Sequence, residues 1–197
     1  MPPLNRRAFL GTSCAALPLL AHDSALLGGV LRRGTPHDST PRPLSDPVPV
    51  LVRAGQDRDG SHKTLGISTI DFKVTSADSG GAMLVIENTN RARGGPARHR
   101  HLAQDELFTI IEGEYVIVIG AERYELTAGD CIFAPRMVPH VWAYTGKSVG
   151  RMLVTFTPPG DMESFFRIVS GTNAMPAQDP ALWRAHGMEL LGPPLPV

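Results

Sequence analysis

The sequence of 197 residues has few cysteines and aromatic residues, and no excess of charge of either sign. Of its two cysteines, Cys14 lies in the expected N-terminal export signal, so Cys131 alone cannot form an internal disulfide and the fold must depend on its core, with or without a bound metal. Basic and acidic residues both number 19, so no basic field of the kind that attracts nucleic acid is implied. No apolar run reaches the ~20 residues of a membrane-spanning helix. We therefore expect no nucleic-acid partner and no stable membrane span, and we expect Cys131, in an apolar run, to be buried and inert.

The N-terminal 25 residues have the layout of an export signal. Arg6 and Arg7 stand shortly before an uncharged apolar run that extends from Gly11 to Ala21. A basic segment followed by a short apolar segment is typical of such signals, and the paired arginines resemble a twin-arginine signal. An ordinary secretory signal or a chance basic N-terminus is the alternative. We expect residues 1–25 to direct export to the periplasm or the exterior.

The rest of the chain changes composition twice. Residues 26–55 are rich in proline and predict a linker or an arm. Residues 56–160 contain short apolar runs separated by turn residues, which is typical of an antiparallel barrel or sandwich. The expected strands are 65–74, 82–87, 106–111, 115–119, 123–126, 131–134, 140–144 and 152–156. Residues 161–197 predict a helical extension, with helices over 161–169 and 180–185, and we expect the phenylalanines of the first helix to lie in the core.

Three of the seven histidines and one glutamate form a pattern that suits a metal ion. His99 and His101 point to the same face if their segment is extended, whereas on a helix they diverge by roughly 200°. Glu106 begins the next apolar alternation, and His140 begins a later strand. Three imidazoles and one carboxylate suit one divalent Fe, Mn, Ni, Co, Cu or Zn ion. Asp105 is an alternative to Glu106, and two exposed loop histidines are the simpler interpretation of the first pair.

The same alternation predicts what surrounds the site. Residues two and four positions after Glu106 and His140 share their strand faces and therefore point into the barrel with them. The candidates for a substrate pocket are Phe108, Ile110, Trp142 and Tyr144. Such an apolar, aromatic pocket suits a planar or hydrophobic ligand better than a polyol. Ordinary barrel core accounts equally well for Trp142.

Two segments resemble the motifs of the cupin superfamily. Residues 99–106 (HRHLAQDE), followed by Gly113, resemble the first motif, and residues 129–135 (GDCIFAP), followed by His140, resemble the second. The resemblance implies an all-β fold, a single antiparallel cupin (jelly-roll) β-barrel with short C-terminal helices. It also implies that the three histidines and Glu106 are metal ligands. Related cupins often form dimers, so a homodimer is one expectation.

The chain departs from the cupin motifs at three positions that are not ligands. Arg93 and Met137 replace glycines, and Tyr144 replaces an asparagine. These positions shape turns and pocket walls, so the departures bear on the substrate more than on the metal.

The C-terminal tail resembles that of single-domain cupins related to quercetin dioxygenases. This resemblance implies an oxygen-dependent metalloenzyme acting on a small phenolic or apolar substrate. Glu106 would then be catalytic, as a ligand that leaves the metal to accept the substrate proton. Two alternatives stay open. One is an isomerase or lyase that uses the metal as a Lewis acid, and the other is a protein that binds a metal or a small ligand without turnover.

Overall fold

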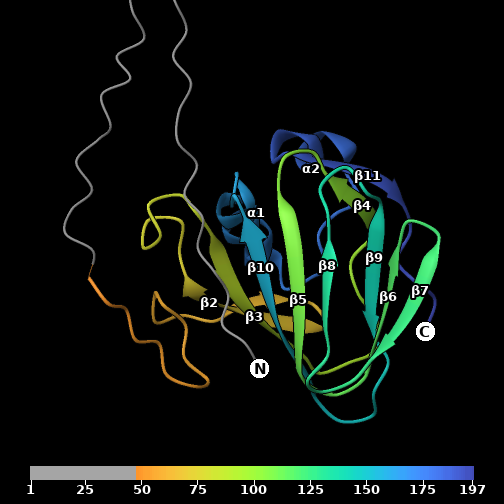
Figure 1. Ribbon diagram of the computed structural model, residues 1–197, viewed down its shortest axis with the longest axis horizontal. Helices are drawn as coiled ribbons and strands as arrows, with labels where there is room; N and C mark the ends of the chain where they lie inside the picture. The colour runs from red at the N-terminus through yellow and green to blue at the C-terminus, as the bar shows by residue number, and fades with distance from the viewer. Residues whose placement is uncertain (1–47) are drawn as a thin grey trace, which may run out of the picture. The chain divides into compact units, whose positions relative to one another are not determined.

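The structure, a computed structural model, describes residues 48–197 (Figure 1). The expected export signal, residues 1–25, and most of the proline-rich segment 26–55 lie outside the described residues and stay predictions. Within the described part, all paired strands run antiparallel in two sheets.

The larger sheet has the strand order β1-β2-β3-β10-β5-β8. Its strands are β1 (Lys63–Leu65), β2 (Ser68–Val74), β3 (Leu84–Asn90), β10 (Gly150–Thr157), β5 (Asp105–Glu112) and β8 (Cys131–Ala134). The second sheet has the order β11-β4-β9-β6-β7. Its strands are β11 (Met188–Gly192), β4 (Arg98–His101), β9 (His140–Tyr144), β6 (Tyr115–Ile119) and β7 (Glu122–Leu126). The expected all-β fold, a single antiparallel jelly-roll barrel with short C-terminal helices, is confirmed.

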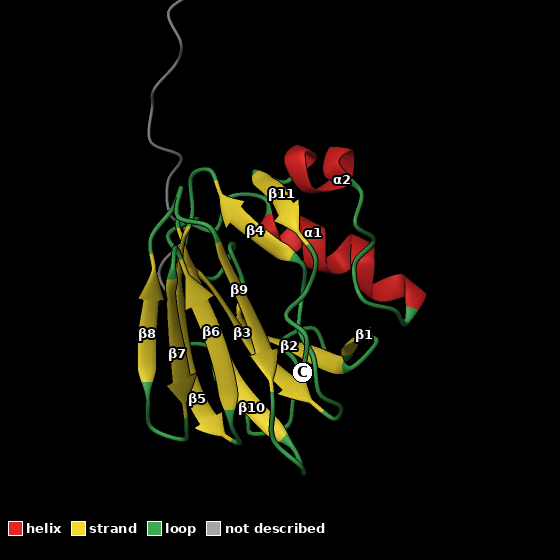
Figure 2. Ribbon diagram, turned by 90° about the vertical axis from the view of Figure 1, so that its right-hand side faces the viewer, coloured by secondary structure: helices red, strands yellow, loops and turns green. Residues whose placement is uncertain are grey.

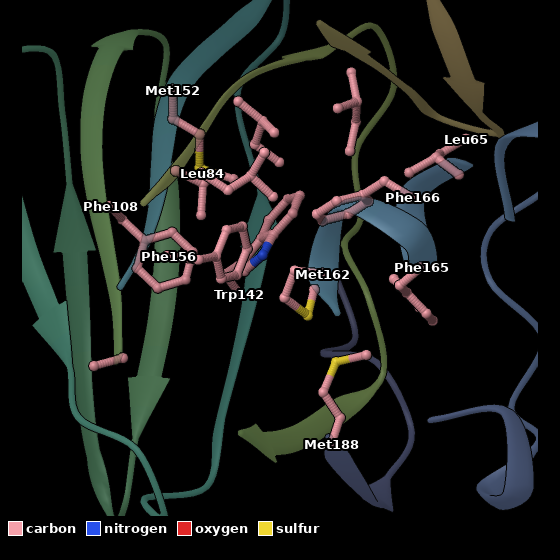
Figure 3. Packing of buried hydrophobic residues seen from close by; sticks show 14 of the residues in the cluster. Leu65, Leu84, Phe108, Trp142, Met152, Phe156, Met162, Phe165, Phe166 and Met188 are labelled. Carbon is pink, nitrogen blue, oxygen red and sulfur yellow. The ribbon is translucent and has the colours of Figure 1, made fainter. Parts of the chain in front are cut away.

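Strict alternation on the central strands builds the core between the sheets. On β5, Glu106, Phe108 and Ile110 are buried, while the residues between them are half-buried. Strand β10 repeats the pattern with Met152 and Phe156. Figure 3 shows Phe108, Met152 and Phe156 in one cluster with residues from neighbouring elements. Each large apolar side chain buried here contributes about 1.5–3 kcal/mol to folding, so this cluster fixes the register of the sheets.

Two short helices lie beside β4 and β11 (Figure 2). Helix α1 (Met162–Val169) buries Met162, Phe165, Phe166 and Val169, which the spacing of a helix places on one face. A 3-10 turn (Ser170–Thr172) and helix α2 (Pro180–Ala185) follow. Among residues 48–197, no helix is both long and apolar enough to cross a membrane.

The structure corrects two details of the predicted strands. Residues 65–74 form two strands, because Gly66, with φ +57°, turns the chain between β1 and β2. Strand β11 lies in the C-terminal segment for which only helices were predicted, and it pairs with β4. Its five residues are too few for a clear alternation, so tertiary pairing decides their conformation.

Cys131 was predicted to be buried, and this prediction was wrong. The residue is exposed at the start of the edge strand β8, and its Sγ accepts a hydrogen bond from Thr109 Oγ1 at 3.6 Å. The apolar run was interpreted as a wholly buried strand. An edge strand instead buries one face alone, and Cys131 and Phe133 lie on the other.

Candidate metal centre

Strand β4 is extended, as the spacing of its two histidines requires. It lies between β11 and β9, with His99 opposite Leu190 on one side and opposite His140 on the other. His101 lies opposite Met188. The pairing on both sides holds the two imidazoles on the same face as His140, which points them toward the barrel interior.

A close approach of the backbone leads into β4. A Cβ atom on Gly95 would lie 1.9 Å from the carbonyl oxygen of Trp142, so only glycine allows the chain to cross β9 here. Gly94 pairs with Tyr144 in an isolated bridge. The cupin motif has a glycine at the position of Arg93. In this chain the close backbone approach is made by the next two residues, Gly94 and Gly95.

Glu106 approaches the histidines from the other sheet. It lies on β5 opposite Phe156 of β10, and its side chain is buried. One donor atom from each of the four candidate ligands can be chosen so that all lie within 4.8 Å of one another. The side chains that the structure brings together are His99, His101, Glu106 and His140. The imidazole centroids are 4.6 Å apart for His99 and His140 and 5.2 Å apart for His99 and His101.

Backbone carbonyls orient two of the imidazoles. The Nδ1 atom of His99 lies 2.8 Å from the carbonyl oxygen of Ala97, and that of His140 lies 3.1 Å from the carbonyl oxygen of Val138. When Nδ1 donates its hydrogen to a carbonyl, Nε2 is the nitrogen left to face the cluster. Metal-binding histidines in proteins are commonly fixed by such hydrogen bonds.

The contacts of Glu106 and His101 leave buried ring nitrogens of the cluster without hydrogen-bond partners. Glu106 Oε2 lies 2.9 Å from Nε2 of His140 and 3.2 Å from Nε2 of His101, but only the first contact has the geometry of a hydrogen bond. Neither ring nitrogen of His101 has a hydrogen-bond partner among the described residues, although the residue is 1% exposed. A buried polar group without a partner costs about 1–3 kcal/mol, and an ion bound by one of these nitrogens would supply a partner that the described protein atoms do not.

The donor set fits one divalent transition metal. Bonds of about 2.0–2.2 Å place donors on opposite sides of an ion up to roughly 4.4 Å apart. The observed limit of 4.8 Å requires the side chains to close by a few tenths of an ångström. Imidazole and carboxylate ligands are compatible with each of the six metals named above, so the donors fix the class of the metal and not its identity.

The surroundings of His99 and Glu106 favour the protonation state in which each can bind a metal. Burial, aided by the neighbouring His140 and His101, lowers the pKa of His99 to about 3, so this ring is neutral. Burial alone would raise the pKa of Glu106, but the adjacent imidazoles of His101 and His140 outweigh it and lower the pKa. For His140, burial lowers the pKa, but the contacts with Glu106 together raise it by more, so the pKa is raised overall. A neutral imidazole and an ionised carboxylate are the forms that bind metals.

A cavity adjoins the cluster and is lined mainly by apolar side chains. Its volume is about 60 Å³, measured as the space open to the centre of a water molecule. One water needs roughly 10–15 Å³ on this measure, so the cavity has room for more than one water-sized group. His99, His101 and Glu106 lie on its wall.

Of the four pocket residues predicted from alternation, Trp142 lines this cavity. Phe108, Ile110 and Tyr144 are buried in the barrel core and are absent from the cavity wall. Phe108 packs against the His140 ring, with centroids 6.2 Å apart. Alternation gave the inward face correctly, but it could not show which inward residues border open space.

Several residues of the cavity wall were not predicted from the sequence. Phe156 of β10, Phe165 and Phe166 of α1 and Trp183 of α2 all line the cavity. The phenylalanines of α1 were predicted to be core residues; they belong to the core and face the cavity as well. Figure 3 shows Phe165, Phe166 and Met162 beside Trp142 and Phe156. No local signal identifies them, because helix packing brings them to the site.

Comparisons with known proteins show which family and which proteins the chain resembles. Residues 90–156 match the family model described as "Cupin domain". An uncharacterised protein of Streptomyces coelicolor is 32% identical over 57 residues, which are 29% of this chain and 53% of that protein. An uncharacterised protein of Methanocaldococcus jannaschii is 30% identical over 61 residues, which are 31% of this chain and 49% of that protein. The matches thus span about half the length of these relatives.

Among solved structures, KdgF from Halomonas sp. aligns with a TM-score of 0.43 and 16% sequence identity, covering 49% of this chain and 84% of that one. The more specific resemblance of the C-terminal tail to quercetin dioxygenases stays a prediction. The family match over residues 90–156 confirms the resemblance of the two motifs to the cupin superfamily.

Proposed function

We propose that this chain is an oxygen-dependent metalloenzyme that acts on a small phenolic or apolar substrate. The observation that carries the proposal is the convergence of four buried donors beside a mainly apolar cavity, with both nitrogens of His101 lacking a hydrogen-bond partner among residues 48–197. His99, His101, Glu106 and His140 would hold the metal. When bound, a divalent metal would supply Lewis-acid polarisation of a substrate hydroxyl and, if redox-active, electron transfer to dioxygen.

Glu106 is the group placed to accept a proton. It is ionised near neutral pH because its pKa is lowered, and it lines the cavity into which a substrate hydroxyl would enter. A general base must lie within hydrogen-bond reach of the proton it removes, and Glu106 is the acidic residue on the wall of this cavity among the described residues. Its role is to take the hydroxyl proton as the substrate oxygen gains negative charge.

The remaining wall residues bind and orient the substrate. Trp142, Phe156 and Phe166 present aromatic surfaces, and their burial excludes bulk water from the cluster. An aromatic ring gains about 0.5–1.5 kcal/mol from such a contact beyond simple burial. A polyol would leave most of its hydroxyl groups without partners here, which disfavours sugar substrates.

Oxygen uptake tests the proposal. The full chain is loaded separately with Fe, Mn, Ni or Cu and assayed with a panel of catechols and flavonols in an oxygen electrode. We expect uptake with at least one metal, and we expect Glu106→Gln to reduce it by a factor of 10²–10⁴, because general-base catalysis is worth this much.

The matched control is Glu112→Gln, which changes an exposed glutamate on the same strand. No oxygen uptake with any metal and any substrate would contradict the proposal. Turnover by the zinc form without oxygen would instead identify an isomerase or lyase. Ligand binding without turnover in every metal form would identify a binding protein.

A further inference from the structure

A buried amide lies on the cavity wall outside the metal cluster. Asn88 of β3 lines the cavity and is 2% exposed. Its Nδ2 donates a hydrogen bond to Asn90 Oδ1 at 2.7 Å, and the Tyr115 hydroxyl donates to the same oxygen at 3.0 Å. The hydrogen bond to Asn90 uses the Nδ2 end of the Asn88 amide and leaves its Oδ1 end over.

The Oδ1 atom of Asn88 has no hydrogen-bond partner within the described part of the chain. Most buried acceptors in proteins are paired, and an unpaired one is unfavourable enough to call for an explanation. Ser68, the other small polar side chain on the wall, donates to the Leu65 carbonyl oxygen at 3.4 Å. Outside the ligand cluster, Asn88 is therefore the wall residue whose side chain has an acceptor left to offer.

Strand register places Asn88 far from the metal cluster. Asn88 lies opposite Met152 on β10, whereas Glu106 lies opposite Phe156 on the same strand. Four residues along a strand correspond to roughly 13 Å. The wall next to Asn88 comes from β2, where Ile70 is its cross-strand partner. The cavity thus has two polar regions, the ligand cluster and Asn88, with apolar wall between them.

Resting on the proposed function, we infer that Asn88 is a specificity-determining residue that accepts a hydrogen bond from the end of an elongated substrate remote from the metal. The substrate class is an elongated, mostly apolar molecule, such as a two-ring phenol, with a hydroxyl or N–H donor at that end. Val154, Phe156 and Ile86 contact its apolar body. A molecule without the second donor leaves the Asn88 oxygen unpaired, and the site discriminates against it.

The test compares two ligands that differ in one hydroxyl group. Binding of 4,4′-dihydroxystilbene and of 4-hydroxystilbene to the full chain loaded with zinc is measured by calorimetry, without turnover. We expect the dihydroxy compound to bind about fivefold more tightly, as one added hydrogen bond predicts. Asn88→Leu should abolish this preference while leaving the affinity for 4-hydroxystilbene within about twofold.

Tyr115→Phe is the matched control, because it breaks the same hydrogen-bond network away from the cavity wall. We expect it to retain the preference. Equal affinities in the wild type, failure of both ligands to bind, or a preference that survives Asn88→Leu would each overturn the inference. A loss of preference in Tyr115→Phe equal to that in Asn88→Leu would do the same. None of these results depends on oxygen uptake, which decides the proposed function separately.

Discussion

Asp57 and Lys63 form an ion pair within the segment that precedes the first long strand. Lys63 Nζ lies 2.9 Å from both carboxylate oxygens of Asp57, and the Phe72 backbone N–H donates to Oδ2 at 2.7 Å. The Asp57 side chain is fully buried and that of Lys63 is 8% exposed. Removing the Asp57 charge leaves the Lys63 ammonium with the Asp59 carboxylate, which is farther away at 3.5 Å and partly exposed, so the pair fastens this segment to β2.

We expect Asp57→Asn to lower the free energy of unfolding by about 3 kcal/mol at pH 7. Burial alone would raise the pKa of Asp57, but hydrogen bonds from Lys63 and from the backbone of Phe72 and Asp59 outweigh it and lower the pKa. A lowered pKa in the folded state stabilises the protein above about pH 4, the unfolded value, and this contribution is lost as the pH falls through the folded value. The difference between wild type and variant should therefore shrink at pH 3.

Urea unfolding at pH 7 and pH 3 measures this difference. Asp161→Asn is a suitable control, because this exposed carboxylate makes no capping hydrogen bond to helix α1. A destabilisation by Asp57→Asn that is equal at both pH values would show that the ion pair is not its source.

At the scale of elements, strand β11 supports the histidine strand. Arg100 of β4 forms an ion pair with Glu189 of β11 at 2.6 Å, and Met188 of β11 is buried opposite His101. Without β11, β4 would be an edge strand held by its short pairing with β9. The C-terminal strand therefore determines how precisely two of the four ligands are placed.

We expect truncation after Gly187 to lower the free energy of unfolding by at least about 2 kcal/mol, the typical cost of removing one buried methionine side chain. The truncated chain should also hold less metal, because β4 is no longer paired on both sides. Denaturant unfolding and elemental analysis measure the two effects. Truncation after Gly192 keeps β11 and serves as the control. Equal metal content in the two truncated chains would contradict the assigned role of β11.

The local sequence pattern predicted correctly those elements whose ends are marked by particular residues. Strands β6, β8 and β9 and helix α2 have the predicted bounds, because glycines, prolines or a capping aspartate mark their ends. Strands β4 and β11 were not predicted as strands. Four and five residues give too little alternation, and their conformation depends on pairing with each other.

At the scale of the whole molecule, the two motifs predicted which side chains converge, and the structure brings those four together. The far parts of the cavity could not be predicted in this way. None of Asn88, Phe156 and Trp183 lies within either motif. They reach the cavity through sheet register and helix packing, which single-sequence periodicity does not contain.

The candidate ligands also connect the two sheets. His99, His101 and His140 come from the second sheet, whereas Glu106 comes from the larger one. An ion held by all four would join the layers of the barrel, so metal binding is coupled to folding of the domain. The central claim is therefore that this cluster binds one metal ion per chain.

Elemental analysis of the purified full chain tests that claim most directly. After incubation with each candidate divalent metal and removal of the excess, we expect close to one equivalent of at least one metal. The double variant His99→Ala, His101→Ala should retain less than about a tenth of it, because tight binding needs the full donor set. His62→Ala and His186→Ala, which change histidines outside the cluster, should bind as the wild type does. A wild-type chain that retains no metal, or a double variant that retains as much as wild type, would contradict the account.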